Sequence, residues 1–155
     1  MIVPVVGTSG RVNDHRAVFR LFSGEMCHRS LRIFAGSPEL VPMFDYNDRR
    51  FRPVQNTANG ETSAETIFHY KQEGRVLTSS YAGGQIVSGQ LIGLVDDEGR
   101  IDMRYQQVND SGELMTGVCN SIPEIMNDGR IHLHETWKWT SGDRSSGSSV
   151  LEEIA

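Results

Sequence analysis

Cysteine pairs, long hydrophobic runs and an excess of positive charge are all missing from this sequence, and each absence excludes a class of protein. The 155 residues include two cysteines, Cys27 and Cys119, which are far apart and outside any C-x-x-C motif. This argues against a disulfide framework or a zinc site and favours a reducing cytoplasm. No apolar run approaches the roughly 20 residues that span a bilayer, and the first residues lack the basic flank of a secretory signal. The formal net charge of −5 argues against a nucleic-acid partner, because phosphate contacts need a basic surface.

What remains is the composition of one globular domain, with a change of character near Met43. Residues 1–42 hold five arginines and three acidic residues, whereas the rest holds ten Lys or Arg and seventeen Asp or Glu, which gives net charges of about +2 and −7. We therefore predict a poorly structured N-terminal extension over residues 1–42 and a single domain over 43–155. One short helix could form over 14–22, where Asp14 could cap it. An upstream start codon is the favoured origin of the extension, and an organelle-targeting peptide is the alternative.

Regular turn signals after Met43 predict an all-β domain. Gly, Asn and Asp recur at 59–60, 73–74, 83–84, 96–99, 109–112, 127–129 and 141–143, where hairpins need the positive φ that Gly adopts without cost. Between them lie runs with β propensity at 49–54, 66–72, 75–82, 85–95, 100–108, 113–120, 130–140 and 148–154. Short strands with short connections predict neighbours that pair in sequence, and closure of the first strand on the last removes both edges. We predict an eight-strand antiparallel up-and-down barrel.

The predicted turns also indicate which residues face one another. Counting back from each turn gives facing pairs with the apolar residues on one side: Tyr70–Leu77, Phe68–Ser79, Tyr81–Ile86, Leu94–Ile101, Ile92–Met103 and Tyr105–Thr116. In the seventh run the same face carries Ile131, Leu133, Glu135, Trp137 and Trp139. These residues are predicted to point into the barrel.

Along the barrel the predicted inward residues separate into an apolar plug and a polar half. The plug consists of Leu94, Ile101, Ile92, Met103, Val118, Ile131 and Leu133. The polar half consists of Tyr70, Ser79, Tyr81, Ser88, Gln90, Tyr105, Gln107, Thr116, Glu135, Trp137 and Trp139. Each unpaired buried polar group costs about 1–3 kcal/mol, so this half predicts a pocket for one small ligand. The alternative is an internal polar network with trapped water. Residues 141–147 could act as a lid.

Glu135 is the sharpest candidate, because a buried carboxylate must be paired or neutral. It would bind a donor or positive group of a ligand, or pair with an arginine such as Arg52. His132 and His134 share the outer face of the same run without a third ligand, so no metal site is expected, and no cofactor is implied. The outer face of the second to fourth runs is predicted to carry apolar residues, with Val76 beside Leu91 and Val87 near Ile67, and with Gly89 and Gly93 as flat ground between them. Such a face predicts self-association through these runs.

Several segments resemble a known family. They are residues 65–74 (ETIFHYKQEG), 104–110 (RYQQVND), 112–117 (GELMTG), 139–143 (WTSGD) and 147–153 (GSSVLEE). Residues 51–154 are similar to small bacterial proteins labelled "N-acetylglutamate synthase", and the resemblance implies an avidin-like barrel, although avidin's biotin-contact pattern is not recognisable. It supplies no catalytic residues.

The predicted barrel and the family resemblance suggest two alternative functions. A non-catalytic ligand-binding barrel is favoured, and an acyltransferase, as the label implies, is the alternative. Acetyl-CoA is usually held at a strand-to-helix turn, whereas the glycine-rich segment 83–89 runs into another strand.

Overall fold

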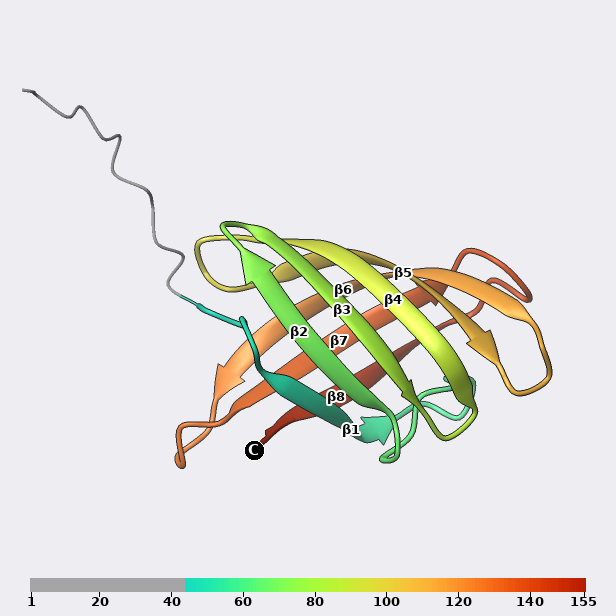
Figure 1. The fold of residues 1–155 in the computed structure, drawn as a ribbon, viewed down its shortest axis with the longest axis horizontal. Coiled ribbons are helices and arrows are strands. Elements are labelled where there is room, and N and C mark those ends of the chain that lie inside the picture. The colour runs from blue at the N-terminus through green and yellow to red at the C-terminus, as the bar shows by residue number, and fades with distance from the viewer. Residues whose placement is uncertain (1–43) are drawn as a thin grey trace, which may run out of the picture. The chain divides into compact units, whose positions relative to one another are not determined.

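The computed structural model describes residues 44–155, and the predicted N-terminal extension with its helix lies outside them. The predicted all-β class and the eight-strand antiparallel barrel are confirmed (Figure 1). The strands are β1 (Arg50–Asn56), β2 (Ile67–Glu73), β3 (Val76–Gly83), β4 (Ile86–Val95), β5 (Ile101–Asn109), β6 (Leu114–Ile125), β7 (Ile131–Trp139) and β8 (Ser146–Ile154). Among residues 44–155, no helix is long and apolar enough to cross a membrane.

Each strand pairs antiparallel with the one before it, and β1 closes the barrel against β8. The two neighbours of β1 hold it unequally. It shares six register pairs with β8, from Arg50–Ile154 to Asn56–Ser149, but two with β2. The chain then leaves β1 in a long connection, residues 57–66, at the end of the barrel where the cavity described below lies.

Three hairpins use the same connection, and it changes the register that turn counting predicts. The β4–β5, β5–β6 and β6–β7 hairpins each end a tight turn on a glycine with positive φ, at Gly99 (81°), Gly112 (78°) and Gly129 (85°). This connection has three residues, one more than a two-residue turn, because the left-handed glycine adds a bulge. Residues of the following strand that would point inward after a two-residue turn therefore point outward after this connection, and their neighbours point inward.

The predicted facing of β4 and β6 is wrong, in β4 because of a bulge and in β6 because of the three-residue connection at Gly112. In β4 a bulge after Ile86 shifts the register, so Gly89, Leu91, Gly93 and Val95 point inward. Ile92 and Leu94 of the predicted plug are 57% and 60% exposed. In β6 the inward residues are Gly117, Cys119 and Ser121, and the predicted Thr116 and Val118 lie on the other face. The inward orientation predicted for residues of β2, β3, β5 and β7 is confirmed, although Tyr70 lies opposite Ser79 and Phe68 opposite Tyr81, two residues away from the predicted partners.

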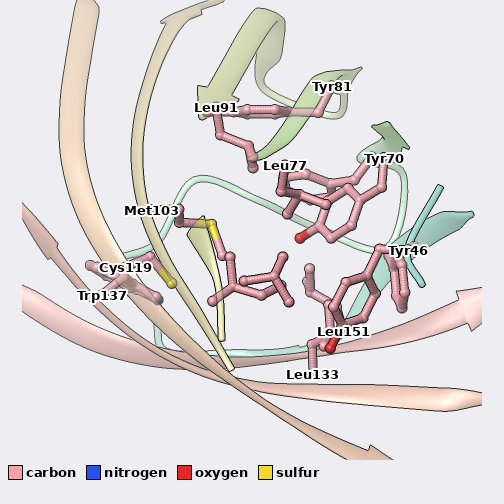
Figure 2. Close-up of a cluster of buried hydrophobic side chains, with 14 of the residues drawn as sticks. Tyr46, Tyr70, Leu77, Tyr81, Leu91, Met103, Cys119, Leu133, Trp137 and Leu151 are labelled. Atoms are coloured by element: carbon pink, nitrogen blue, oxygen red, sulfur yellow. The ribbon is translucent and has the colours of Figure 1, made fainter. Parts of the chain in front are cut away.

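The core fills one end of the barrel, which we call the closed end. Its fully buried side chains include Phe51, Val95, Ile101, Leu133 and Leu151. The segment before β1 completes this end: Tyr46 is 0% exposed, and its hydroxyl donates a hydrogen bond to the carbonyl of Gly99 at 2.7 Å. Figure 2 shows Tyr46, Leu133 and Leu151 on one side of the cluster, with Met103, Cys119 and Trp137 on the other.

Candidate functional site

A half-enclosed cavity of about 50 Å³ lies inside the other end of the barrel, which we call the open end. At about 10–15 Å³ for each water molecule, it has room for a few waters or a small ligand group. Each of the eight strands contributes at least one lining residue, and the β1–β2 connection contributes three. The lining residues are Asn56, Gly60, Glu61, Thr62, Phe68, Tyr81, Leu91, Met103, Tyr105, Gln107, Cys119, Glu135, Trp137, Trp139 and Ser149.

The structure brings together six of the eleven residues predicted for the polar half. Those that line the cavity are Tyr81, Tyr105, Gln107, Glu135, Trp137 and Trp139. Tyr70 and Ser79 are buried inside the barrel but do not line the cavity. The inward orientation predicted for Ser88, Gln90 and Thr116 is wrong, because the bulge in β4 and the connection at Gly112 turn them outward.

Nine lining residues were missing from the predicted set, for three different reasons. Leu91 and Cys119 were assigned to the outer face by the register error. Phe68 and Met103 were predicted to point inward but were not assigned to the polar half. The loop residues Gly60, Glu61 and Thr62 carry no periodic pattern, and only the position of their loop at this end could have indicated them. Asn56 and Ser149 complete the set.

The β1–β2 connection lies across the open end and is bonded to both sides of it. Glu61 accepts hydrogen bonds from the side chains of Gln107 at 2.5 Å and Asn109 at 2.9 Å. On the other side, the Asn59 side chain donates to Ser145 Oγ at 3.0 Å, and the Trp139 indole donates to the Asn59 carbonyl at 3.3 Å. The cover of the cavity is therefore this connection, bonded to the 141–147 segment predicted as a lid.

Glu135 provides the cavity with a carboxyl group that has no cationic partner among the described residues. Protein surrounds the side chain, although its carboxyl group keeps accessible surface because it faces the cavity. Burial raises its pKa from 4.5 to about 7, and the hydrogen bond that Ser149 Oγ donates to Oε2 at 2.7 Å opposes this rise only in part. The predicted alternative partner, Arg52, instead pairs with Glu152 at 2.7 Å on the outside. The carboxyl group thus exchanges its proton near neutral pH.

The strand register explains why Glu135 has polar neighbours. Ser121 of β6 and Ser149 of β8 lie directly opposite it on the two adjacent strands. Ser121 Oγ and the hydroxyl of Tyr70 are buried without a hydrogen-bond partner, and Figure 2 shows the Tyr70 ring directed toward the middle of the cluster. Burial and the nearby Glu135 carboxylate raise the pKa of the Tyr70 hydroxyl and the Cys119 thiol. These groups stay protonated at neutral pH.

Large aromatic side chains form the walls because glycines on neighbouring strands make room for them. A Cβ built on Gly89 would overlap the ring of Tyr81, one on Gly117 would overlap Tyr105, and one on Gly147 would meet Trp137. Gly117 lies directly between Tyr105 and Trp139 in the register of β5, β6 and β7. Glycine within a strand commonly marks such a close approach.

The outer histidines do not form a metal centre with other residues of the described part. His134 Nε2 lies 2.6 Å from Glu124, and His132 Nε2 lies 3.8 Å from Glu152, so each has a separate acidic partner. Within residues 44–155, no group of three or more His, Cys, Asp or Glu side chains could hold a metal ion.

The fold and the cavity define an up-and-down β-barrel with an internal site at one end. The chain belongs to the avidin-like family, since the model of the family described as "Avidin-like protein" matches residues 44–154. A search of the curated proteins finds no match. The avidin-like part of the sequence resemblance is therefore confirmed. No finding supports its N-acetylglutamate synthase part, and the glycine-rich segment 83–89 enters β4 without a helix.

Proposed function

We propose that this protein binds a small molecule in the cavity at the open end of its barrel and does not transform it. The Glu135 carboxyl group carries this proposal. It faces an internal cavity, it has a pKa raised to about 7 by burial, and its only hydrogen-bond donor in the described chain is Ser149. A barrel selected for stability alone gains nothing from an unpaired acid inside it, since burying a charge without a partner destabilises the fold.

The composition of the lining favours binding over covalent catalysis. Cys119 is the one thiol in the lining, and its pKa is raised by burial, so the reactive thiolate is scarce at neutral pH. None of the lining residues is a histidine or a lysine, so the only bases available to a nucleophile in the cavity would be the carboxyl groups of Glu61 and Glu135. The aromatic rings supply contact area, and Gln107 and Glu135 supply the few polar contacts that orient a ligand.

Tryptophan fluorescence tests the proposal directly, because the chain has two tryptophans and both line the cavity. Screening a metabolite library should identify compounds that shift the emission saturably and raise the melting temperature. The control is the Trp137→Phe variant, which should keep part of the signal change through Trp139. If no compound of any charge shifts either observable, the binding function is wrong.

We further propose that the protein self-associates through the outer face of β3 and β4. The predicted pairing of Val76 with Leu91 is wrong, since Leu91 points inward, but Val76 pairs with Leu94 instead. Val76 and Leu94 are 44% and 60% exposed, and Ile92 continues the same face. Such contiguous apolar surface commonly marks an interface.

Sedimentation velocity at micromolar concentration should show a species larger than a monomer, and Leu94→Glu should convert it to a monomer. Asp128→Asn, at the exposed β6–β7 turn away from this face, is a control that should not change the sedimentation. A wild-type protein that sediments as a monomer would refute self-association.

A further inference from the structure

The charges of the cavity have one sign. Two carboxyl-bearing residues, Glu61 and Glu135, line it, and the lining contains no Lys, Arg or His. The neighbouring residues at the open end add to this sign: Asn109 bridges Glu61 to a further acid, Glu113, at 2.9 and 3.1 Å. An anionic ligand would therefore enter the cavity against two acids and find no cation to bind.

Glu135 has one side available to a ligand. Ser149 Oγ donates to Oε2 at 2.7 Å, and within residues 44–155 no protein group donates to the other oxygen, Oε1. Because the residue faces the cavity, Oε1 is free to accept a hydrogen bond from a bound molecule. A charged donor makes the stronger bond there, since hydrogen bonds between ionised partners are about twice as strong as neutral ones.

Aromatic side chains line the same space on two sides. Phe68 and Tyr81 stack with their ring centroids 4.6 Å apart. On the opposite side, Trp139 lies 5.7 Å from Trp137 and 5.4 Å from Tyr105, again between centroids. The faces of these rings carry negative potential and attract organic cations, and the attraction grows when the cation is desolvated.

We propose that the ligand is a small organic cation, an ammonium or guanidinium group on a short carbon frame, whose charge lies against Glu135 between these aromatic walls. This inference rests on the proposed binding function and specifies its ligand class. A metal ion suits the site poorly, because no group of three or more His, Cys, Asp or Glu side chains that could hold one occurs within residues 44–155. The cavity volume of about 50 Å³ accommodates the charged group, and any longer part would extend toward the open end.

Matched ligands that differ in charge test the class on the wild-type protein. Methylguanidinium and methylurea have nearly the same planar shape, and benzylammonium, benzyl alcohol and benzoate form a second series. Each is titrated at millimolar concentration or below, with tryptophan emission and calorimetry as the readouts. We expect each cation to bind at least 10-fold more tightly than its neutral partner and benzoate to bind most weakly. Equal or tighter binding of the neutral compounds or benzoate would overturn the inference while leaving the binding function intact.

Charge-removing variants then locate the contact. Glu135→Gln should weaken methylguanidinium binding at least 10-fold and leave methylurea binding within about 2-fold, because the amide oxygen still accepts the Ser149 bond. Glu61→Gln should give a smaller loss, since Glu61 already accepts two protein hydrogen bonds. Glu73→Gln, which removes one exposed charge at the β2–β3 turn, is the matched control and should bind both ligands as the wild type does.

The outcomes separate the two proposals. If Glu135→Gln binds methylguanidinium as tightly as the wild type, Glu135 is not the cation contact and the inference fails. If that variant does not fold, the comparison of matched ligands on the wild type decides alone. If no compound of either series binds and the wider library also fails, both the ligand class and the binding function are wrong.

Discussion

The two ends of this barrel have the same backbone architecture but opposite interiors. At the closed end, Leu133 and Leu151 are fully buried, and the Tyr46 hydroxyl bonds to a backbone carbonyl. At the open end, the interior surface belongs to aromatic rings, two acids and an amide network, and it surrounds a cavity. The change occurs within β7, between Leu133 and Glu135, two residues apart on one face. Side-chain choice at alternate positions thus gives one strand both a half that packs in the core and a half that lines the cavity.

The largest effect should come from the closed end, where Leu133→Ala removes a fully buried side chain. We expect a loss of about 2–5 kcal/mol in the free energy of unfolding, from lost burial and the cavity that remains. Urea denaturation measures this loss. Leu114→Ala, at a position that is 64% exposed, is the control and should stay within about 0.5 kcal/mol of the wild type. A comparable loss in both variants would show that the closed end is not the stabilising half.

The next effect belongs to the open end and depends on pH. The pKa of Glu135 rises from 4.5 to about 7 on folding, so between these values the folded protein holds a proton that the unfolded chain has released. Stability should therefore fall as pH rises through this window and stay low above it. The difference corresponds to at most about 3 kcal/mol, at 1.36 kcal/mol for each pKa unit. Glu135→Gln, which cannot ionise, should be more stable than the wild type at pH 8 and similar at pH 4.5.

Urea denaturation of both proteins across this pH range provides the measurement. Both proteins carry the same other ionisable groups, so the difference between the two curves isolates Glu135. The buried tyrosines 70, 81 and 105 and Cys119 have raised pKa values and remain neutral throughout. Parallel curves for the two proteins would mean that the carboxyl group is not desolvated, and that the open end is wetter than its geometry implies.

A smaller effect should follow from Gly117→Ala, which tests the packing of the open-end walls. The added methyl group would overlap the Tyr105 ring, so Tyr105 must move from its position beside Trp139. We expect a cost of about 1–3 kcal/mol and weaker ligand binding. In a Tyr105→Ala background the same substitution should cost less than about 0.5 kcal/mol, and this double-mutant cycle is the control. Equal costs in both backgrounds would place the strain elsewhere.

The sequence was sufficient to predict the strand number, the order of pairing and the closure, because each hairpin carries its own turn residues. It also placed Glu135, Trp137 and Trp139 correctly, since β7 alternates cleanly between apolar and polar residues. The facing of β4 and β6 was not predictable from the turns as counted. The bulge in β4 and the three-residue connections at Gly99, Gly112 and Gly129 each shift the register by one residue, and successive shifts cancel in pairs, so the errors alternate between strands.

The mid-strand glycines could have corrected this register. Gly89 and Gly93 were taken as flat ground on the outer face, but both are buried, and Gly89 lies under Tyr81. Placing Gly89 and Gly117 inward would have brought Leu91 and Cys119 with them. The position of loop residues such as Glu61 could not have been predicted in this way, because a long connection has no repeating hydrophobic pattern that indicates which of its side chains point inward.

The last prediction is that removal of residues 1–42 does not change the melting temperature. The family match begins at residue 44, and the closed end is completed by Phe44, which contacts Gly99, and by Tyr46. A chain that starts at Met43 keeps both aromatic residues, so its melting temperature should equal that of the full chain. A chain that starts at Asn47 lacks Tyr46, which is 0% exposed, and should melt several degrees lower, at roughly 4 °C or more for each 1 kcal/mol lost. Thermal unfolding of the three proteins makes the comparison. If the Met43 chain also melts lower, residues before 43 contribute to the stability of the barrel, and the closed end extends further along the sequence than Phe44.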